Sequence, residues 1–528
     1  MKQLTGIDNF FINSERGNVY NHVAALGIYD PSTAPSGKVR FKEILEHFRQ
    51  RVMTTPSFRR RLVTVPFGLD RPYWVDSPDL DIEFHIRHIA LPHPGDWRQL
   101  MIQVARIHSR PLDRSRPLWE IYVIEGLDNI PDMPAGAFAL FSKFHHSQMD
   151  GNATARVLFN LHADSATPAV PSTETATVIT ERDPLTPELY ARALGNTVRR
   201  AAGFARFVAK TSGKVASIAA KVLAERANRG DGTLDMDAVK AAIGHGKAPQ
   251  TRFNTKLSAN RSVDAAALPL DQVKTIRSAF PDTTVNDIFL SVCGGALRHY
   301  LESKGELPSA GLRGLMPISV RKAGKAEGNE VGGVAVLLHS EIADPIERLM
   351  AVQRDAVTAK GGAAVVGPDL VQAIYNELPF AASNFLIRHM VFDQLNCTVS
   401  NVRGPDIPLY VAGARAVHMY PVSIPIDGVG VNFTGFSYNG VMWISCVSCR
   451  NMVPDPAFLA DCLRQAGAEL LAAAQRKLAA EAVPRVEKSA LAARHNRAKP
   501  AAKRVSKPIA KVIPSKTKSV KPTLRKVA

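Results

Sequence analysis

The sequence predicts an α/β protein, because segments with the two-residue period of strands occur among segments with helical spacing. Residues 137–144 place Phe138, Leu140 and Phe144 on one side of a strand. Residues 285–303 place apolar side chains at helical intervals after a capping Thr283 or Thr284, and Lys304-Gly305 should end that helix. The 528 residues, 45% of them hydrophobic, are enough for two or three domains with large cores, so a disordered protein is excluded.

The first part of the chain supplies further elements. Residues 41–53 predict a helix, and residues 152–162 predict another from the spacing of Val157, Leu158 and Leu161. Residues 118–124 predict a strand in which Trp119, on one face with Ile121 and Val123, is typical of a core residue.

Residues 145–151 form an HHxxxDG box between the predicted strand 137–144 and the predicted helix 152–162. An imidazole has an unperturbed pKa of about 6.5, so it can accept a proton near neutrality and activate an alcohol or amine. We therefore predict His146 as the proton acceptor and His145 as a supporting residue. The alternative is a pair of buried structural histidines.

The end of the same box has predicted structural roles. Asp150 stands where its carboxylate can cap the following helix or pair with an arginine, so we expect it to orient the corner. Gly151 allows a tight turn because it has no β-carbon. Neither residue needs to touch substrate.

Several segments, in order, resemble the bacterial wax ester synthase/diacylglycerol acyltransferase family, which belongs to the CoA-dependent acyltransferases that share HHxxxDG. The resemblance covers most of residues 4–480. Besides the box, it rests on LTGID at residues 4–8, PLW within residues 110–120, Asn286-Asp287, and SNVRGP at residues 400–405.

The resemblance implies a two-lobed fold with mixed sheets and an active-site channel between the lobes. It also implies acyl-CoA as co-substrate, no cofactor, and diacylglycerol or a long-chain alcohol as acceptor, giving triacylglycerol or wax ester. His146 would take the hydroxyl proton as the oxygen attacks the thioester. The substrate-binding residues that we carry over are Asn286, Asp287, Trp119 and Asn401.

The residues themselves leave alternatives open at these positions. Asn286 is either a buried structural clamp or a polar group that lines a cleft. Trp119 is either structural or pocket-lining. Asn401, with Gly404 and Pro405, is expected in a turn that places one loop at the cleft.

The composition divides the chain into four parts: an N-terminal lobe (1–162), a crossover linker (163–254), a C-terminal lobe (255–484) and a disordered basic tail (485–528). The linker contains an Ala-rich helical segment, residues 188–223, with seven Lys and Arg and one acid. This segment is either a basic amphipathic helix at a membrane surface or an ordinary linker helix packed on a lobe.

The net charge of +18 is concentrated in the tail. Residues 485–528 hold 14 Lys and Arg and one acid, a charge of +13, which leaves only +5 for residues 1–484. Such a tail can bind anionic lipid or nucleic acid, but it has no aromatic residue to stack on a base. It can also be a solvated extension with no dedicated partner.

Metal and covalent chemistry are not expected. Cys446 and Cys449 lie on a predicted strand, 441–449, that Asn439-Gly440 joins to residues 430–437, and no second cysteine pair accompanies them. Cys293 lies within the apolar helix 285–303 and is expected to be a core thiol.

The chain contains no run of 18 apolar residues, and its N-terminus lacks the pattern of a secretory signal. We therefore expect a cytoplasmic protein that associates peripherally with membrane or lipid droplets. Three rival functions remain: acylation of another alcohol or an amine, a non-catalytic lipid-droplet or membrane scaffold, and a nucleic-acid-binding protein suggested by the tail alone.

Overall fold

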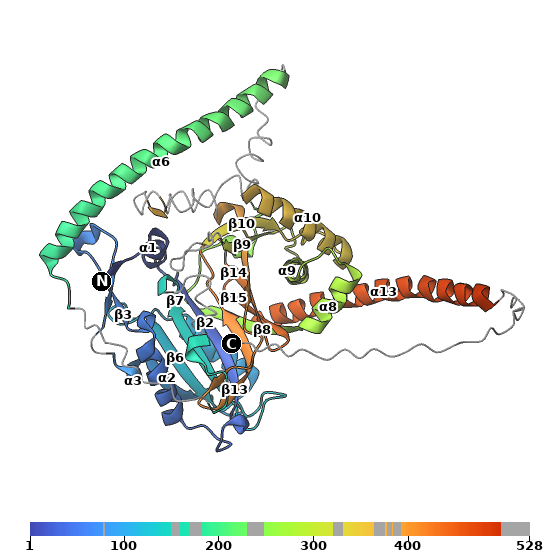
Figure 1. The fold of residues 1–528 in the computed structure, drawn as a ribbon, viewed down its shortest axis with the longest axis horizontal. Coiled ribbons are helices and arrows are strands. Elements are labelled where there is room, and N and C mark those ends of the chain that lie inside the picture. The colour runs from blue at the N-terminus through green and yellow to red at the C-terminus, as the bar shows by residue number, and fades with distance from the viewer. Residues whose placement is uncertain are drawn as a thin grey trace, which may run out of the picture. The chain divides into compact units, whose positions relative to one another are not determined.

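Two six-stranded mixed sheets organise the protein (Figure 1). The computed structural model describes residues 1–77, 80–148, 159–167, 182–229, 248–319, 331–363, 375–376, 383 and 392–497. Helices and strands alternate along much of the chain, so the α/β prediction is confirmed.

The first sheet has the strand order β12-β13-β2-β7-β6-β5. Its strands are antiparallel except for the parallel pair β5 and β6. Their bounds are β2 (His22–Asp30), β5 (Ile86–Ala90), β6 (Trp119–Glu125), β7 (Phe138–His145), β12 (Tyr410–Val411) and β13 (Ala414–Val422).

The second sheet has the order β10-β9-β11-β14-β15-β8. Strand β11 runs parallel to β9 and β14, and the other pairs are antiparallel. The bounds are β8 (Arg261–Pro269), β9 (Arg313–Ser319), β10 (Val331–Leu337), β11 (Cys397–Arg403), β14 (Val431–Tyr438) and β15 (Val441–Cys449).

A three-stranded sheet and the helices complete the described elements. The small sheet has the order β1 (Lys2–Gln3), β4 (Tyr73–Asp76), β3 (Arg60–Val63). The α-helices are α1 (Gly6–Asn13), α2 (Phe41–Thr54), α3 (Ile82–His85), α4 (Trp97–His108), α6 (Thr186–Arg229), α8 (Leu270–Ala279), α9 (Val285–Ser303), α10 (Pro345–Ala363) and α13 (Pro456–Arg497). The 3-10 turns are η1 (Pro31–Thr33), η2 (Pro56–Phe58), η3 (Pro66–Gly68), η4 (His146–Gln148), η5 (Arg252–Asn254) and η6 (Phe392–Gln394).

Strands β12 and β13 connect the two halves of the chain, because they follow the second-lobe strand β11 in sequence but extend the first sheet. Residues 415–422 of β13 pair with residues 24–30 of β2. The main buried cluster accordingly combines first-half residues such as Leu26 and Phe141 with second-half residues such as Met419 and Trp443. The predicted boundaries at residues 162 and 255 do not anticipate that β12 and β13, from the second half of the chain, belong to the first sheet.

Local signals place several elements correctly. Helix α9 begins after Thr284, whose side chain accepts from the Asp287 amide in a capping box. It ends before Gly305, which has a φ of +67°. Asn439 and Gly440 have φ values of +50° and +78°, and they join β14 to β15 as the hairpin prediction requires.

Two predictions about the second half are wrong. Asn401 lies within β11, paired with Gly435, rather than in a turn, because the alternating residues 397–403 continue the strand up to Gly404. Helix α13 continues to Arg497, so the disordered tail does not begin at residue 485; residues 498–528 lie outside the described residues. The helix is long because residues 456–483 are rich in Ala and Leu, which favour helix.

The linker helix is confirmed as α6, which starts at Thr186 and reaches Arg229. Of the predicted helix 152–162, the structure describes only residues 159–162, of which 159–161 are helical. Within the described residues, no helix has the length and apolar character needed to cross a membrane. The chain divides into two compact units, residues 1–476 and 477–528.

Candidate active site

The two histidines of the HHxxxDG box lie where the chain leaves the first sheet. His145 is the last residue of β7 and pairs with His22 of β2, while His146 opens η4. The amide of His145 donates to the carbonyl of Leu118 at 2.9 Å, and the amide of His146 donates to the carbonyl of Asn21 at 2.8 Å. Both neighbouring segments therefore fix the backbone of this corner.

The His145 side chain is buried and held at both ring nitrogens. Its Nδ1 lies 2.7 Å from the Ser147 hydroxyl oxygen, and its Nε2 lies 3.2 Å from Oε1 of Glu15. Arg114 donates to the other oxygen of Glu15 at 2.8 Å. These contacts fix the orientation of His145, which fits the predicted supporting role.

Glu15 supplies a negative charge beneath the histidine pair. Burial by itself raises the pKa of this carboxyl group, but hydrogen bonding and charge from His145, together with the hydrogen bond from Arg114, outweigh burial and lower the pKa. Glu15 is therefore ionised at neutral pH. It also accepts a 2.6 Å hydrogen bond from the Asn21 amide, so it couples His145 to the segment that fixes His146.

His146 stacks on Phe11 of α1, with ring centroids 4.0 Å apart and planes inclined by 24°. Burial, with a smaller contribution from the charge of His145, lowers the pKa of His146 to about 4. The imidazole is consequently neutral at pH 7 and can accept a proton. Helix α1 is itself fixed by a capping box between Thr5 and Asp8, so the stacked ring has a rigid support.

Asp150 and Gly151 lie outside the described residues, so their predicted roles in orienting and turning the corner remain predictions. The same applies to most of the helix expected at residues 152–162.

The Asn286-Asp287 pair lies at the N-terminus of α9 in the second half of the chain. The Asp287 carboxylate accepts from the Thr284 amide at 2.9 Å, and its side chain is engaged in the helix cap. The Asn286 amide group donates to the Met316 sulfur at 3.2 Å. The two neighbours therefore differ: Asp287 stabilises the helix, and Asn286 projects toward β9.

Trp119 is completely buried in the main core. Its indole NH donates to the Phe58 carbonyl at 2.8 Å, and its ring stacks on His85 with centroids 4.3 Å apart. This environment matches the structural alternative for Trp119. Asn401 is exposed on β11.

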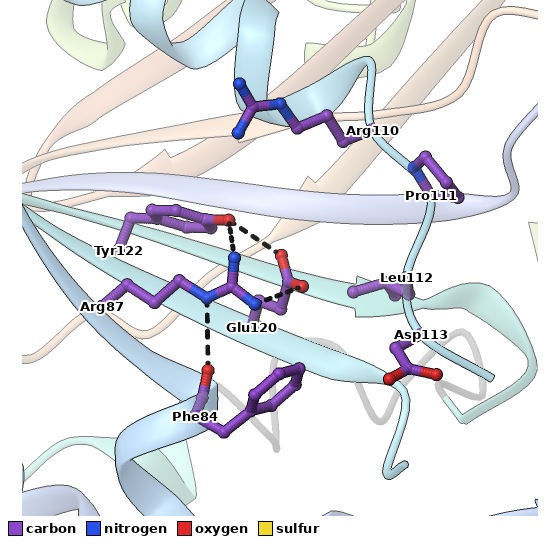
Figure 2. Close-up of a pocket in the computed structure, with 8 residues that line it drawn as sticks. All are labelled: Phe84, Arg87, Arg110, Pro111, Leu112, Asp113, Glu120 and Tyr122. Carbon is purple, nitrogen blue, oxygen red and sulfur yellow. Dashed lines mark hydrogen bonds and ion pairs between the residues drawn. The ribbon is translucent and has the colours of Figure 1, made fainter. Parts of the chain in front are cut away.

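The segment at residues 110–120 that carries PLW also lines a pocket of about 330 Å³ (Figure 2). Buried Glu120 lies at its centre and interacts with Arg87 at 3.4 Å, Tyr122 at 3.1 Å and Lys143 at 3.3 Å. Burial raises the pKa of Tyr122 to about 12, with the charge of Glu120 acting in the same direction. The complete lining is Phe84, Arg87, Arg110, Pro111, Leu112, Asp113, Glu120 and Tyr122, so the HHxxxDG histidines are not part of it.

The sequence reasoning missed four residues that contact the two histidines or hold their contacts in place: Phe11, Glu15, Arg114 and Ser147. Glu15 and His145 are 130 residues apart in sequence, and no local pattern links them. Arg114 was visible only as part of the segment 110–120. Ser147 lies inside the box itself, where its position two residues after His145 was the available signal.

The described residues contain no group of three or more His, Cys, Asp or Glu side chains arranged to hold a metal ion. Cys293, Cys446 and Cys449 are buried free thiols. Burial raises the pKa of Cys293 well above its usual value, so this thiol is poorly suited to act as a nucleophile.

Comparison with known families identifies two matching regions. Residues 4–289 match the wax ester synthase/diacylglycerol acyltransferase catalytic domain, and residues 327–470 match the C-terminal domain of the same family. Two proteins of Mycobacterium tuberculosis, provisionally named diacylglycerol O-acyltransferases, are each 31% identical to this chain. One aligns over 486 residues, covering 89% of this chain and 90% of the relative; the other aligns over 501 residues, covering 92% and 99%.

Solved structures share the fold. The wax ester synthase/diacylglycerol acyltransferase of Marinobacter aquaeolei VT8 is 26% identical and superposes with a TM-score of 0.62, covering 90% of this chain and all of that chain. The first condensation domain of the calcium-dependent antibiotic synthetase is 14% identical, with a TM-score of 0.52 over 90% of this chain and 96% of that chain. The second likeness concerns the fold alone.

Proposed function

The chain belongs to the wax ester synthase/diacylglycerol acyltransferase family, and from that premise we propose that it transfers an acyl group from acyl-CoA to the hydroxyl of diacylglycerol or a long-chain alcohol. The products would be triacylglycerol or wax ester. Acyl-CoA serves as a co-substrate, and the reaction needs no cofactor.

In the proposed mechanism His146 removes the proton from the acceptor hydroxyl as its oxygen attacks the thioester carbonyl. A carbon–oxygen bond forms and the carbon–sulfur bond breaks. The departing CoA thiolate takes the proton back from His146, so His146 ends the cycle neutral. The acyl group passes directly to the acceptor, and no enzyme nucleophile is required.

The observation that carries this proposal is the neutral, half-buried imidazole of His146 at the end of β7, stacked on Phe11 and beside a second histidine that is fixed by Glu15. A base must be unprotonated before the reaction, and a pKa of about 4 ensures this at physiological pH. In this proposal His145 positions the corner, Asp150 orients it, and Gly151 permits its turn.

The other carried-over residues have proposed roles of different directness. We assign Asn286 to the substrate side of the second lobe, and Asp287 to the support of Asn286 through the α9 cap. Trp119 supports the corner from the core, since Phe144, which precedes His145, pairs with it across β6 and β7. Asn401 is proposed to contact substrate from β11.

The test is a product assay with purified full-length protein, palmitoyl-CoA and either diacylglycerol or hexadecanol. CoA release and neutral-lipid product are measured together. Formation of triacylglycerol or wax ester at the rate of CoA release supports the proposal. If the protein turns over only with another alcohol or an amine, that compound is the acceptor in place of diacylglycerol or a long-chain alcohol. Lipid binding without any turnover would indicate a non-catalytic scaffold.

Peripheral association with a membrane or lipid droplet belongs to the same proposal, because the acceptors are apolar. The basic tail is one proposed contributor, since each basic residue near an anionic surface contributes about 1 kcal/mol before screening. Deleting residues 498–528 should leave turnover on dispersed substrate unchanged and weaken vesicle co-sedimentation most at low salt. If the full-length and the truncated protein sediment equally with vesicles, the tail does not contribute to lipid binding. If the tail binds nucleic acid but not vesicles, nucleic acid is its partner.

A further inference from the structure

Helix α6 rests on the small sheet through a face that is partly polar. Leu189 and Ala193 are buried there in a cluster with Tyr73. Asn196 donates to Asp70 at 2.7 Å, and Arg200 donates to the other oxygen of Asp70 at 2.6 Å. The Asp70 side chain is fully buried, so these bonds fix the rotation of α6 about its own axis.

The opposite face of α6 is exposed and apolar. At 3.6 residues per turn, Leu194 and Val198 point away from the buried positions, and they are 71% and 66% exposed. We call this surface the outward face; its other members are Ala191, Gly195, Ala202 and Ala205, all exposed. A helix that only packed on the lobe would direct its larger apolar residues inward and its polar residues outward.

Two further exposed apolar residues lie in the turn that precedes Asp70, on the side of the docked face. Phe67 in η3 is 90% exposed, and Leu69 is 55% exposed, immediately before Asp70. Phe67 also has a φ of +57°, a conformation that a phenylalanine rarely adopts. Of the exposed large hydrophobic residues in 185–204, Leu194 and Val198 are on the outward face, whereas Tyr190 and Phe204 are on other sides of the helix and Leu185 directly precedes it.

The charge along the same helix is strongly positive. Arg192, Arg199 and Arg206 recur every seven residues along one border of the outward face, and each is exposed; Arg192 forms an ion pair with Glu188 at 3.1 Å. By sequence, Thr186–Arg229 contains nine Lys and Arg and two Glu. An apolar strip bordered by arginines is the arrangement that binds the interface of an anionic lipid surface.

We propose that the outward face of α6, with the arginines along its border, is a docking site for an anionic phospholipid surface. Leu194 and Val198 enter the acyl boundary, and Arg192, Arg199 and Arg206 contact the phosphates. The inference deepens the proposed function by locating its lipid contact in the catalytic body, apart from the basic tail.

The docking site is tied to the catalytic corner through the start of the chain. Gln3 donates to Asp70 at 2.8 Å and accepts from Asn196 at 3.2 Å. Two residues later Thr5 caps α1, whose Phe11 stacks on His146. A lipid surface held by α6 is thus connected by one short segment to the wall of the proposed active site.

The experiment is co-sedimentation of full-length protein with phosphatidylcholine vesicles that contain or lack phosphatidylglycerol, across ionic strength. Leu194→Gln/Val198→Gln should reduce binding to anionic vesicles by about tenfold or more. Arg199→Gln/Arg206→Gln should reduce it several-fold, only on anionic vesicles and only at low salt. The matched control is Val357→Gln on α10, which removes an apolar side chain of similar exposure (63%) and should bind normally.

Wild-type binding by both double variants would overturn the proposal, and so would an equal loss in the Val357→Gln control. The wild-type protein must also be tested for self-association in the absence of lipid. If it self-associates and Leu194→Gln/Val198→Gln abolishes the association, the outward face binds a second copy and the proposal is overturned. Each variant is also assayed with palmitoyl-CoA and a water-soluble alcohol, where turnover should match the wild type. Normal docking without acyl transfer by any protein would refute the proposed function while leaving the docking site intact.

Discussion

The histidine corner at the end of β7 and the N-terminus of α9 each present two adjacent polar residues, and within each pair the two neighbours have different surroundings. His145 and Asp287 are both almost fully buried and hydrogen-bonded to nearby structure. Their neighbours differ. His146 has a pKa of about 4 and an aromatic wall, whereas Asn286 is half-buried and donates to a sulfur.

Two residues that are adjacent in a motif therefore need not share a role. In each pair one residue fixes the local backbone, and this leaves the other for chemistry or binding. Only the first pair contains an imidazole that is neutral at pH 7 and able to accept a proton, so we propose proton transfer for His146 and substrate contact for Asn286.

The largest expected effect comes from the first pair. His146→Ala should lower kcat by about 10²–10⁴-fold while the protein still folds, because it removes the base but leaves the backbone hydrogen bonds of the corner in place. Asn286→Ala, the matched change in the second pair, should cost less than about tenfold. Comparable losses in the two variants would break the distinction between the sites.

A smaller effect is expected from the buried member of the first pair. His145→Ala leaves the Glu15 carboxylate without one of its partners, so it should lower the free energy of unfolding by about 1–3 kcal/mol. Turnover should fall about tenfold through misplacement of His146. Chemical denaturation and steady-state kinetics measure the two effects. A catalytic loss as large as that of His146→Ala, with full stability, would show that His145 acts directly.

The smallest effect is expected at the second pair's buried member. Asp287→Ala removes half of a capping box and should cost about 1 kcal/mol of stability. Thr284→Ala should cost a similar amount, and the double variant less than the sum, because both remove the same cap. An Asp287→Ala enzyme with normal stability and strongly raised KM for acyl-CoA would instead place its carboxylate at the substrate.

The sequence predicts those parts of the fold and the site that depend on neighbouring residues. The α9 cap follows from Thr284, and the β14–β15 hairpin follows from Asn439-Gly440. The strand leading to His145 follows from its alternation, and the HHxxxDG box predicts the histidine corner at its end.

The parts that could not be predicted depend on distant residues. No local pattern in β13 indicates that it will pair with β2, about 390 residues earlier in the chain. Glu15 and His145 both belong to the first lobe, but 130 residues separate them in sequence, so only the folded lobe brings the carboxylate to the imidazole. For the apolar stripe of α6 the sequence leaves packing and lipid binding both open, and only the bonds from Asn196 and Arg200 to Asp70 show which face is turned outward.

The central claim is that a neutral His146 removes the acceptor proton, and the pH dependence of kcat/KM tests it most directly. Because burial lowers the pKa of His146 to about 4, the wild-type rate should stay level as the pH falls from neutral and decline only near pH 4. The folded state must be followed at every pH. Unfolded histidines bind protons from about pH 6.5 downward, whereas folded His146 does not, so stability falls through the window between those two values.

The comparison is made with His146→Ala over the range in which both proteins stay folded, using palmitoyl-CoA and one acceptor. The account predicts an acid limb near pH 4 in the wild type and a low rate without that limb in the variant. An acid limb near pH 6.5 in the wild type, or the same limb retained in His146→Ala, would contradict it.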